Sequence, residues 1–412
     1  MAQARHRAPK GTFDVLPDRE RARALVFDHG AEILDAAGFG RIETPAFEET
    51  ELFERGVGES TDIVRKEMFT FEDQGGRSLT LRPEGTAPIC RAYVEHGMHK
   101  LPQPVRLWYW GPYFRYERPQ EGRFRQFNQI GAETIGTDEP AADAELIVLL
   151  DELLRGLGID DVELRLSSLG SPASREAYRE RLRDHLREHE GELSDEVRSR
   201  IDTNPLRAFD ADHAGTRAVM AGAPTMLGAL EPEDAEHLEA VRRMLDAAGV
   251  AYRLDGTLVR GLDYYTRTVF EFTCERLGSQ SGIGGGGRYD GLVERLGGPP
   301  TAGVGWAAGI ERILLAIREA PPERVPGAFV VAADGDLERA FGIALELRRA
   351  RIATRMDLGG RSAKNQMKRA DRSGAPFAVI LEEGGTVQLR RMESGEQREV
   401  APAELADAIA RG

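Results

Sequence analysis

The chain has 412 residues, 41% hydrophobic and 30% charged, a balance typical of a globular protein of roughly two to four domains. No apolar run approaches the roughly 18 residues that cross a bilayer, and Met1–Pro17 holds no apolar signal core, so we expect a cytoplasmic protein with no membrane partner. The formal charge of −14 does not exclude RNA, because ten basic and only three acidic residues lie between Arg339 and Arg372, and RNA binding depends on local charge.

The first part of the chain predicts helices around an antiparallel sheet. Asp18–Ala37 places apolar side chains at helical spacing, with Gly38 as the cap. A short extended stretch, Phe39–Thr44, ends at Pro45. Three segments rich in aromatic and aliphatic residues then predict strands of one sheet, in which a turn at Pro119–Gly122 joins neighbours. These strands and the helix that follows them are Arg77–Arg82, Arg106–Tyr116, Phe124–Ile135 and Pro140–Leu157.

The second part begins with a polar, Glu/Arg-rich segment from Ser171 to about Ala248 that predicts an inserted helical subdomain. The pattern then predicts, in order, strands at Leu258–Arg260 and Thr268–Thr273, a glycine-rich turn at Gly282–Gly287, a helix at Ile310–Glu319 and a proline-rich linker at Ala320–Gly327. Beyond the linker, strands and helices alternate as βαβαβ, which predicts a small separate α/β domain. Its elements are Phe329–Ala333, Asp336–Arg349, Ala353–Met356, Ala363–Arg372 and Phe377–Leu381.

Several common site motifs are absent or weak. No Gly-Lys-Ser/Thr follows a glycine-rich loop, and Gly282, Gly284 and Gly287 match a dinucleotide pattern without a βαβ unit around it. His185 and His189 lie one helical turn apart without an evident third ligand, and the two cysteines have no partner spacing. We therefore expect reduced thiols and no metal site in the protein itself.

The most informative segment runs from Tyr113 to Gln129, where arginines alternate with aromatic residues. Guanidinium groups suit phosphate oxygens, and aromatic faces suit a stacked base. The alternative is a hairpin with a charged outer face, in which Arg115 and Glu117 form a salt bridge across one face.

Two further segments carry candidate ligands. Arg260, Asp263, Tyr264 and Tyr265 crowd into a turn between strands, where the hydroxyls suit a small polar ligand, although both tyrosines could simply pack in the core. Leu81–Thr86 offers a carboxylate and a hydroxyl that could hold an ammonium group, although surface-turn chemistry explains these residues equally well.

Together these segments resemble a class II aminoacyl-tRNA synthetase, and within that class the histidyl-tRNA synthetase family. Asp18–Pro45 is similar to the first class motif, Phe114–Glu117 with Arg123–Arg125 to the second, and Gly303–Arg312 to the third. Arg260–Tyr265 and Gly285–Gly291 are similar to the histidine-specific segments of the family. Two positions depart from the family's pattern, Gly284 where many relatives carry a cysteine and Asn128 where histidine is frequent.

The resemblance implies specific residue roles. Glu84, Thr86 and Gln129 would hold the α-amino group of histidine, and Glu133 with Tyr264 or Tyr265 would bind the imidazole. Gly85 would also belong to the histidine site. Arg260 and Arg115 would be the catalytic groups at the substrate carboxylate and the α-phosphate. Arg123 and Arg312 would contact the terminal phosphates of ATP, and the adenine would stack near Phe127.

The same resemblance implies the domains and the partners. A catalytic α+β domain, an antiparallel sheet flanked by helices, would occupy residues 1–170 and 251–320. It would surround a helical insertion at 171–250 and precede an anticodon-binding α/β domain at 327–412. The expected substrates are L-histidine, ATP with its Mg²⁺, and tRNA(His), and the expected assembly is a homodimer. The main alternative is a histidine-sensing regulatory subunit of ATP phosphoribosyltransferase. Another class II synthetase or a pure RNA-binding scaffold would fit fewer of these residues.

Overall fold

The computed structural model describes residues 6–58, 61–258, 261–278, 281–318 and 325–411. The chain divides into two compact units, residues 1–321 and 322–412. No helix among the described residues is long and apolar enough to cross a membrane.

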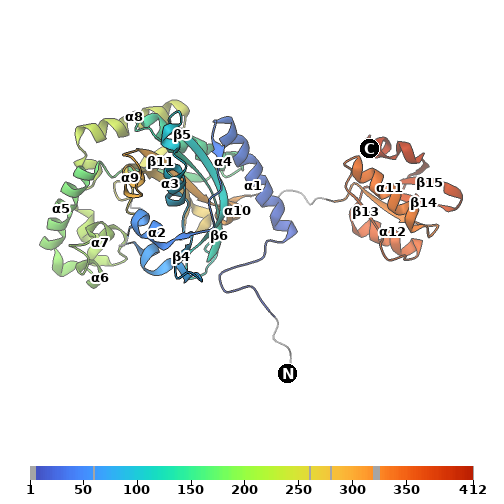
Figure 1. Cartoon of the computed structure of the whole chain (residues 1–412), viewed down its shortest axis with the longest axis horizontal. Helices are drawn as coiled ribbons and strands as arrows, with labels where there is room; N and C mark the ends of the chain where they lie inside the picture. The colour runs from blue at the N-terminus through green and yellow to red at the C-terminus, as the bar shows by residue number, and fades with distance from the viewer. Residues whose placement is uncertain (1–5, 59–60, 259–260, 279–280, 319–324, 412) are drawn as a thin grey trace, which may run out of the picture. The chain divides into compact units, whose positions relative to one another are not determined.

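The first unit is built on an eight-stranded sheet (Figure 1). The pairs at its two edges are parallel and the inner pairs are antiparallel. In spatial order the strands are β1 (Gly40–Arg41), β5 (Val105–Phe114), β6 (Gln126–Ile135), β11 (Gly303–Gly309), β10 (Gly282–Arg288), β9 (Thr266–Cys274), β7 (Val162–Ser168) and β8 (Tyr252–Leu254).

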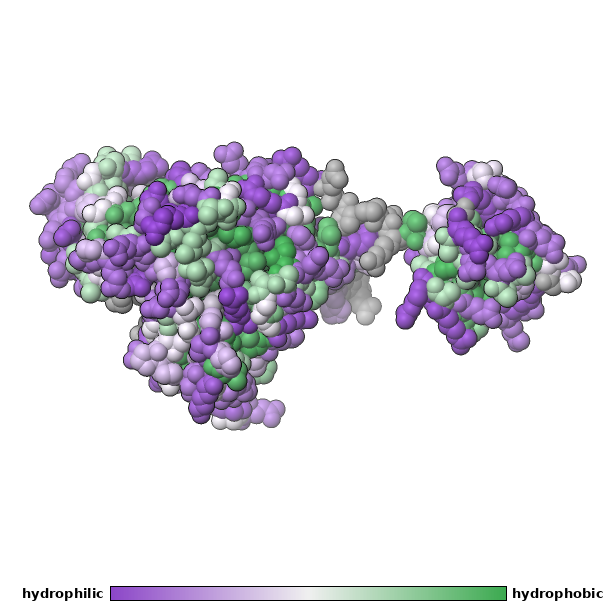
Figure 2. Space-filling model, turned by 90° about the horizontal axis from the view of Figure 1, so that it is seen from above, coloured by the Kyte–Doolittle hydropathy of each residue, from purple (hydrophilic) through white to green (hydrophobic). Residues whose placement is uncertain are grey.

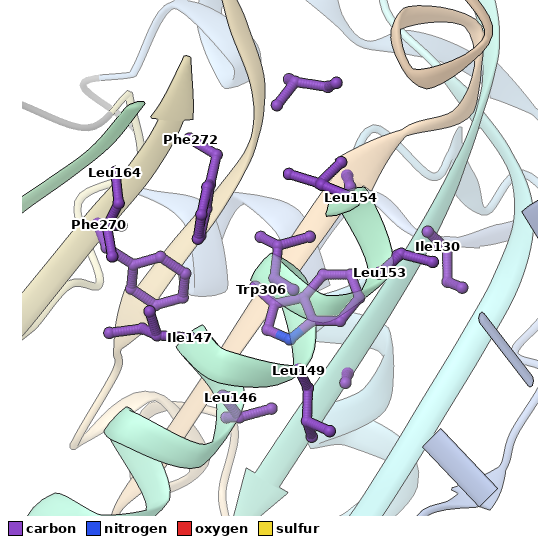
Figure 3. Packing of buried hydrophobic residues seen from close by; sticks show 14 of the residues in the cluster. Ile130, Leu146, Ile147, Leu149, Leu153, Leu154, Leu164, Phe270, Phe272 and Trp306 are labelled. Carbon is purple, nitrogen blue, oxygen red and sulfur yellow. The ribbon is translucent and has the colours of Figure 1, made fainter. Parts of the chain in front are cut away.

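Helices cover both faces of this sheet. Figure 1 shows α1 (Pro17–Ala36), α4 (Pro140–Gly156) and α10 (Ile310–Ala316) on one side, and α2 (Thr50–Val57), α3 (Thr86–Glu95) and α9 (Leu292–Arg295) on the other. The first side carries the main core. Strand side chains alternate between faces, and Trp108 of β5, Ile130 of β6, Trp306 of β11 and Phe270 of β9 all belong to the apolar cluster on this side. Figure 3 shows Trp306, Ile130, Phe270 and Phe272 of the sheet around Leu149 and Leu153 of α4.

The opposite face of the inner strands is rich in glycine. Register pairs Gln129 with Gly111 and Gly309, Glu133 with Gly305, and Glu271 with Gly285. Where glycine stands in place of a larger residue on a sheet face, a ligand can approach the backbone between the remaining side chains. The candidate site lies on this face.

Several predicted elements of the first unit are wrong. Gly282–Gly287 is part of strand β10 and not a turn, because the sheet backbones approach too closely for side chains: a Cβ on Gly286 would lie 1.9 Å from the Gly305 carbonyl oxygen. Leu258 lies in no strand, and the strand after the insertion is β8; Val259 and Arg260 lie outside the described residues. Helix α10 ends at Ala316, before the predicted end.

The strand predicted at Arg77–Arg82 does not join the main sheet. It is β4 (Ser78–Leu81), which pairs with β2 (Phe47–Glu49) and β3 (Phe69–Glu72) in a separate three-stranded sheet. Helix α3 follows β4 directly, so no short turn links β4 to β5.

Residues 172–248 are helical apart from their connections. Helices α5 (Pro172–Glu188), α6 (Asp195–Arg198) and α7 (Ala214–Ala221) enclose their own apolar cluster, which includes Tyr178, Leu182 and Val219. Helix α8 (Pro232–Ala248) instead buries Leu238, Val241 and Leu245 in the core of the large sheet. The segment therefore packs partly by itself and partly on the main body.

The second unit is a five-stranded sheet with helices. Its strand order is β13 (Thr354–Met356), β12 (Ala328–Ala332), β14 (Phe377–Leu381), β15 (Val387–Arg391) and β16 (Gln397–Glu399). The helices are α11 (Leu337–Arg349), α12 (Ala363–Arg372) and α13 (Leu405–Ala410). The first three strands are parallel, as βαβαβ predicts, whereas β15 and β16 add an antiparallel edge that the sequence analysis missed. Hydrophilic residues cover most of the face visible in Figure 2.

Candidate active site

A pocket of about 390 Å³ lies on the glycine-rich face of the large sheet. Arg115, Arg123 and Arg312 line it, together with Phe127 and Gln129. These residues come from the end of β5, the following turn, β6 and α10. The structure thus brings four of the predicted ATP contacts, Arg115, Arg123, Phe127 and Arg312, to one pocket.

The three arginines are held by neighbouring groups. Arg115 donates from Nε to the Pro83 carbonyl oxygen at 2.9 Å, and its guanidinium carbon lies 5.4 Å from the Phe127 ring centre. Arg312 donates to the carbonyl oxygens of Gly122 and Gly282. Burial, helped by the nearby Arg123, lowers the pKa of Arg312. The concentration of positive charge suits a polyphosphate.

Acidic side chains also line this pocket. Glu117 pairs with Arg123 at 3.1 Å, whereas Arg115 donates to the Pro83 carbonyl oxygen. These contacts do not support the alternative in which Arg115 and Glu117 form a salt bridge. Glu311 accepts hydrogen bonds from the backbone amide of Asn128 at 2.9 Å and from its side-chain amide, also at 2.9 Å. Glu311 therefore fixes the strand that carries Phe127 and Gln129.

A buried carboxylate cluster holds most of the predicted histidine ligands. Thr86 donates its hydroxyl to Glu133 at 2.9 Å, and its amide donates to Glu84 at 2.7 Å. The Tyr264 hydroxyl donates to Glu84 at 3.4 Å, and the Tyr109 hydroxyl donates to Glu133 at 3.4 Å. Glu84 is only 4% exposed, so the surface-turn alternative for this segment is wrong.

The two carboxylates titrate unusually because they are buried. Burial, together with the negative charge of the nearby Glu84, raises the pKa of Glu133 to about 8. The hydrogen bond from Thr86 lowers the pKa but does not cancel this shift. Burial also raises the pKa of Glu84, although amide hydrogen bonds from Ala87 and Thr86 oppose it. Groups with strongly perturbed pKa values in an apolar setting are typical of functional sites.

Glycines make room for this cluster. A Cβ on Gly305 would lie 1.6 Å from a Glu133 carboxylate oxygen. A Cβ on Gly85 would lie 2.7 Å from the Tyr113 hydroxyl oxygen, and one on Gly131 would lie 2.4 Å from the Tyr109 hydroxyl oxygen. Glycine at these positions therefore leaves the space that the side chains of Glu133, Tyr109 and Tyr113 occupy.

The pocket and the cluster are neighbours. Tyr113 contacts both, since its ring centre lies 6.2 Å from that of Phe127 and 6.2 Å from that of Tyr109. The side-chain oxygen of Gln129 is buried at the pocket wall without a hydrogen-bond partner among the described residues. Such an acceptor suits a ligand N–H.

The tyrosine segment, Leu262–Tyr265, packs in the core and also contacts the carboxylate cluster. Tyr264 and Tyr265 are 2% and 5% exposed, and their rings lie 4.8 Å apart, so packing in the core is part of their role. Yet the Tyr264 hydroxyl reaches the carboxylate cluster. Arg260, the proposed catalytic arginine, lies outside the described residues.

Some residues of the site were missed by the sequence analysis. Tyr109 and Tyr113 share a strand face with Arg115 at period-two spacing, which was the available signal. Glu311 gave no signal, because its partner Asn128 is far away in the sequence. Arg288, in the second histidine-specific segment, is fully buried and pairs with Asp143 of α4 at 2.7 Å, so it supports the fold rather than lining the pocket.

Among the described residues, no group of three or more potential ligands could hold a metal ion. Cys90 and Cys274 are both buried free thiols.

A mostly antiparallel sheet flanked by helices, with fixed arginines beside a buried carboxylate cluster on its open face, defines the catalytic domain of a class II aminoacyl-tRNA synthetase. A histidyl-tRNA synthetase model matches residues 11–313, and an anticodon-binding domain model matches residues 328–411. The chain belongs to the histidyl-tRNA synthetase family.

Individual relatives cover nearly the whole chain. The histidine–tRNA ligase of Rubrobacter xylanophilus is 47% identical, over 98% of this chain and 99% of that protein. The histidine–tRNA ligase of Desulforamulus reducens is 46% identical, over 96% and 97%. The apo crystal structure of S. aureus histidyl-tRNA synthetase matches with a TM-score of 0.82 at 35% identity, over 98% of this chain and all of the other.

Proposed function

We infer that this chain is a histidine–tRNA ligase, which activates L-histidine with ATP and transfers it to the 3′ end of tRNA(His). The observation that carries this inference is the arginine-lined pocket beside the Glu84–Glu133 cluster, in a chain that matches its family over both units. A polyphosphate and a small cationic amino acid can bind side by side in such an arrangement.

The histidine site is proposed as follows. Glu84, Thr86 and Gln129, beside Gly85, hold the α-amino group, which is supported by the buried oxygen of Gln129 that has no hydrogen-bond partner among the described residues. Glu133 binds the imidazole together with Tyr264 or Tyr265. A buried site that hydrogen-bonds a polar side chain rejects analogues lacking that group by roughly 10⁴–10⁵, so selection needs no editing step.

ATP is proposed to bind along the arginines. Arg115 and Arg260 contact the α-phosphate, Arg123 and Arg312 contact the terminal phosphates, and the adenine stacks near Phe127. Mg²⁺ fits beside the phosphates, because the carboxylates of Glu271 and Glu311 line the same pocket and Mg²⁺ prefers oxygen ligands. It would supply further charge neutralisation of the polyphosphate.

The chemistry then follows from charge. The histidine carboxylate attacks the α-phosphorus, pyrophosphate leaves, and negative charge builds up on the phosphate oxygens. Fixed guanidinium groups facing that charge lower the barrier electrostatically, without a covalent step on any side chain. The terminal adenosine hydroxyl of tRNA next attacks the adenylate carbonyl, which releases AMP.

The regulatory-subunit alternative fits less well. A protein that only senses histidine needs neither the phosphate arginines nor an anticodon-binding domain, and this chain has Arg115, Arg123 and Arg312 at one pocket and matches that domain over residues 328–411. From the family resemblance alone we also propose a homodimer in the cytoplasm.

Separating the two units tests whether the first activates histidine and the second contributes tRNA binding. The full chain should charge tRNA(His) with histidine in the presence of ATP. A truncation ending at Pro326 keeps the pocket and should still catalyse histidine-dependent ATP–pyrophosphate exchange, while charging falls because the basic Arg339–Arg372 region is lost. The salt dependence of tRNA binding should flatten, by about 0.7–0.9 in the log–log slope for each lost phosphate contact. A folded truncation that charges tRNA with full efficiency would contradict the anticodon assignment.

A further inference from the structure

Hydrogen bonds join the helical insertion to the sheet at the point where the tyrosine segment (Leu262–Tyr265) leads into strand β9. Arg267, the second residue of β9, accepts a backbone hydrogen bond from Leu169 at 2.7 Å and donates one to Gly170 at 2.8 Å. Its guanidinium also bonds Asp234 of α8 at 2.9 Å. Both ends of residues 171–234 therefore meet at one residue of the sheet.

Asp234 ties these ends to each other. Its second carboxylate oxygen accepts hydrogen bonds from the Ser171 amide at 2.6 Å and from the Ser174 hydroxyl at 3.1 Å. Ser171 is also the N-cap of α5. Asp234 is only 2% exposed, so these bonds are shielded from water and fix the first turn of α5 against the sheet.

Arg175, in the first turn of α5, reaches from this fixed turn to the tyrosine segment. Its Nη1 donates to the backbone carbonyl oxygen of Tyr265 at 2.7 Å. Burial and the neighbouring Arg179 lower the pKa of Arg175 to about 10, while Asp263 of the tyrosine segment opposes the shift. A charged donor on a carbonyl in such surroundings makes a stronger hydrogen bond than a neutral one.

That carbonyl belongs to the residue beside the proposed histidine contact. The ring of Tyr265 packs on Tyr264 at 4.8 Å between centres, and the Tyr264 hydroxyl donates to Glu84. A shift of the Tyr265 backbone would therefore move Tyr264 away from the carboxylate cluster. The chain from α5 to Glu84 consists of direct contacts.

We propose that Arg175 is a positioning residue for histidine recognition, through which the helical insertion helps to set the affinity for the amino acid. Arg175 does not touch the substrate; it holds the tyrosine segment in its binding position. The inference rests on the proposed function, because it assumes that histidine is the ligand of the Glu84–Glu133 cluster. It follows that a ligand that moves α5 changes histidine affinity, and by linkage histidine changes the affinity for that ligand.

The test compares Arg175→Met with Arg175→Lys in the full chain, using ATP–pyrophosphate exchange at varied histidine and varied ATP. We expect the KM for histidine to rise about tenfold in Arg175→Met, the value of a lost hydrogen bond to a charged group. The kcat and the KM for ATP should change less than about twofold, and Arg175→Lys should recover part of the loss. If Arg175→Met does not fold, Arg175→Gln takes its place with the same expectation.

The matched control is Arg187→Met, on the same helix but at an exposed ion pair with Asp202, which should behave as the unmodified chain. An unchanged KM for histidine in a folded Arg175 variant would overturn the inference, as would equal increases for histidine and ATP. If the unmodified chain itself shows no histidine-dependent exchange, the proposed function fails instead, so the two failures are distinguishable.

Discussion

Arg115→Ala should lower the kcat for ATP–pyrophosphate exchange by about 10²–10³-fold, the loss typical of one fixed donor at developing negative charge. Arg115 lines the pocket and stacks against Phe127, so its position is fixed before ATP binds. Because the charge it meets develops in the transition state, histidine binding measured by calorimetry should change far less than the rate.

Two variants control for structural damage. Arg118→Ala, at an exposed position just before the Pro119–Gly122 turn, should leave the exchange rate unchanged. Arg115 also bonds the Pro83 carbonyl, so Arg115→Lys, which keeps the charge, should recover some of the rate. A rate for Arg115→Ala within about twofold of the unmodified chain would remove Arg115 from the mechanism.

Glu133→Gln should raise the KM for histidine by about 10–100-fold with little effect on the KM for ATP. The carboxyl group of Glu133 can release its proton when the imidazole binds and then form a charge-assisted hydrogen bond, which an amide cannot do. Glu133 is fully buried and accepts from Thr86 and Tyr109, so the amide of Gln can occupy the same space. Normal histidine binding by this variant would show that the imidazole is recognised elsewhere, with Tyr264 and Tyr265 as the next candidates.

The Glu133→Gln substitution should also change how the stability of the folded chain depends on pH. The pKa of Glu133 is raised to about 8 in the folded chain, whereas the pKa of Glu in an unfolded chain is about 4.3. Between these values the folded state holds the proton and the unfolded state does not, so this group makes stability fall as pH rises from about 5 to 8. Melting temperatures of the ligand-free protein should show that Glu133→Gln flattens this slope, while Glu152→Gln, at an exposed position of α4, leaves it in place.

The sequence predicted those parts of the site that depend on local spacing. The arginines around the Pro119–Gly122 turn were assigned correctly to one hairpin, because aromatic and charged residues alternate along β5 and β6. Strand β10 was mistaken for a turn, because glycine usually marks turns and only the facing backbones of β11 and β9 explain its glycines.

Contacts between segments that are far apart in the chain could not be predicted from the sequence. The Arg175–Tyr265 bond joins residues 90 positions apart, and nothing in either segment indicates it. The raised pKa of Glu133 depends on burial among α3 and the sheet, which no pattern in β6 reveals. The β15–β16 edge was missed because the alternation of strands and helices in the second unit suggested that the sheet ended at Leu381.

The central claim is that the buried Glu84–Glu133 cluster selects histidine for activation by ATP. ATP–pyrophosphate exchange, measured with the full chain and each of the twenty amino acids in turn, tests it most directly. The account predicts exchange with histidine and none above background with the others, since they cannot satisfy the buried carboxylates. Exchange with a different amino acid, or with none, would contradict it.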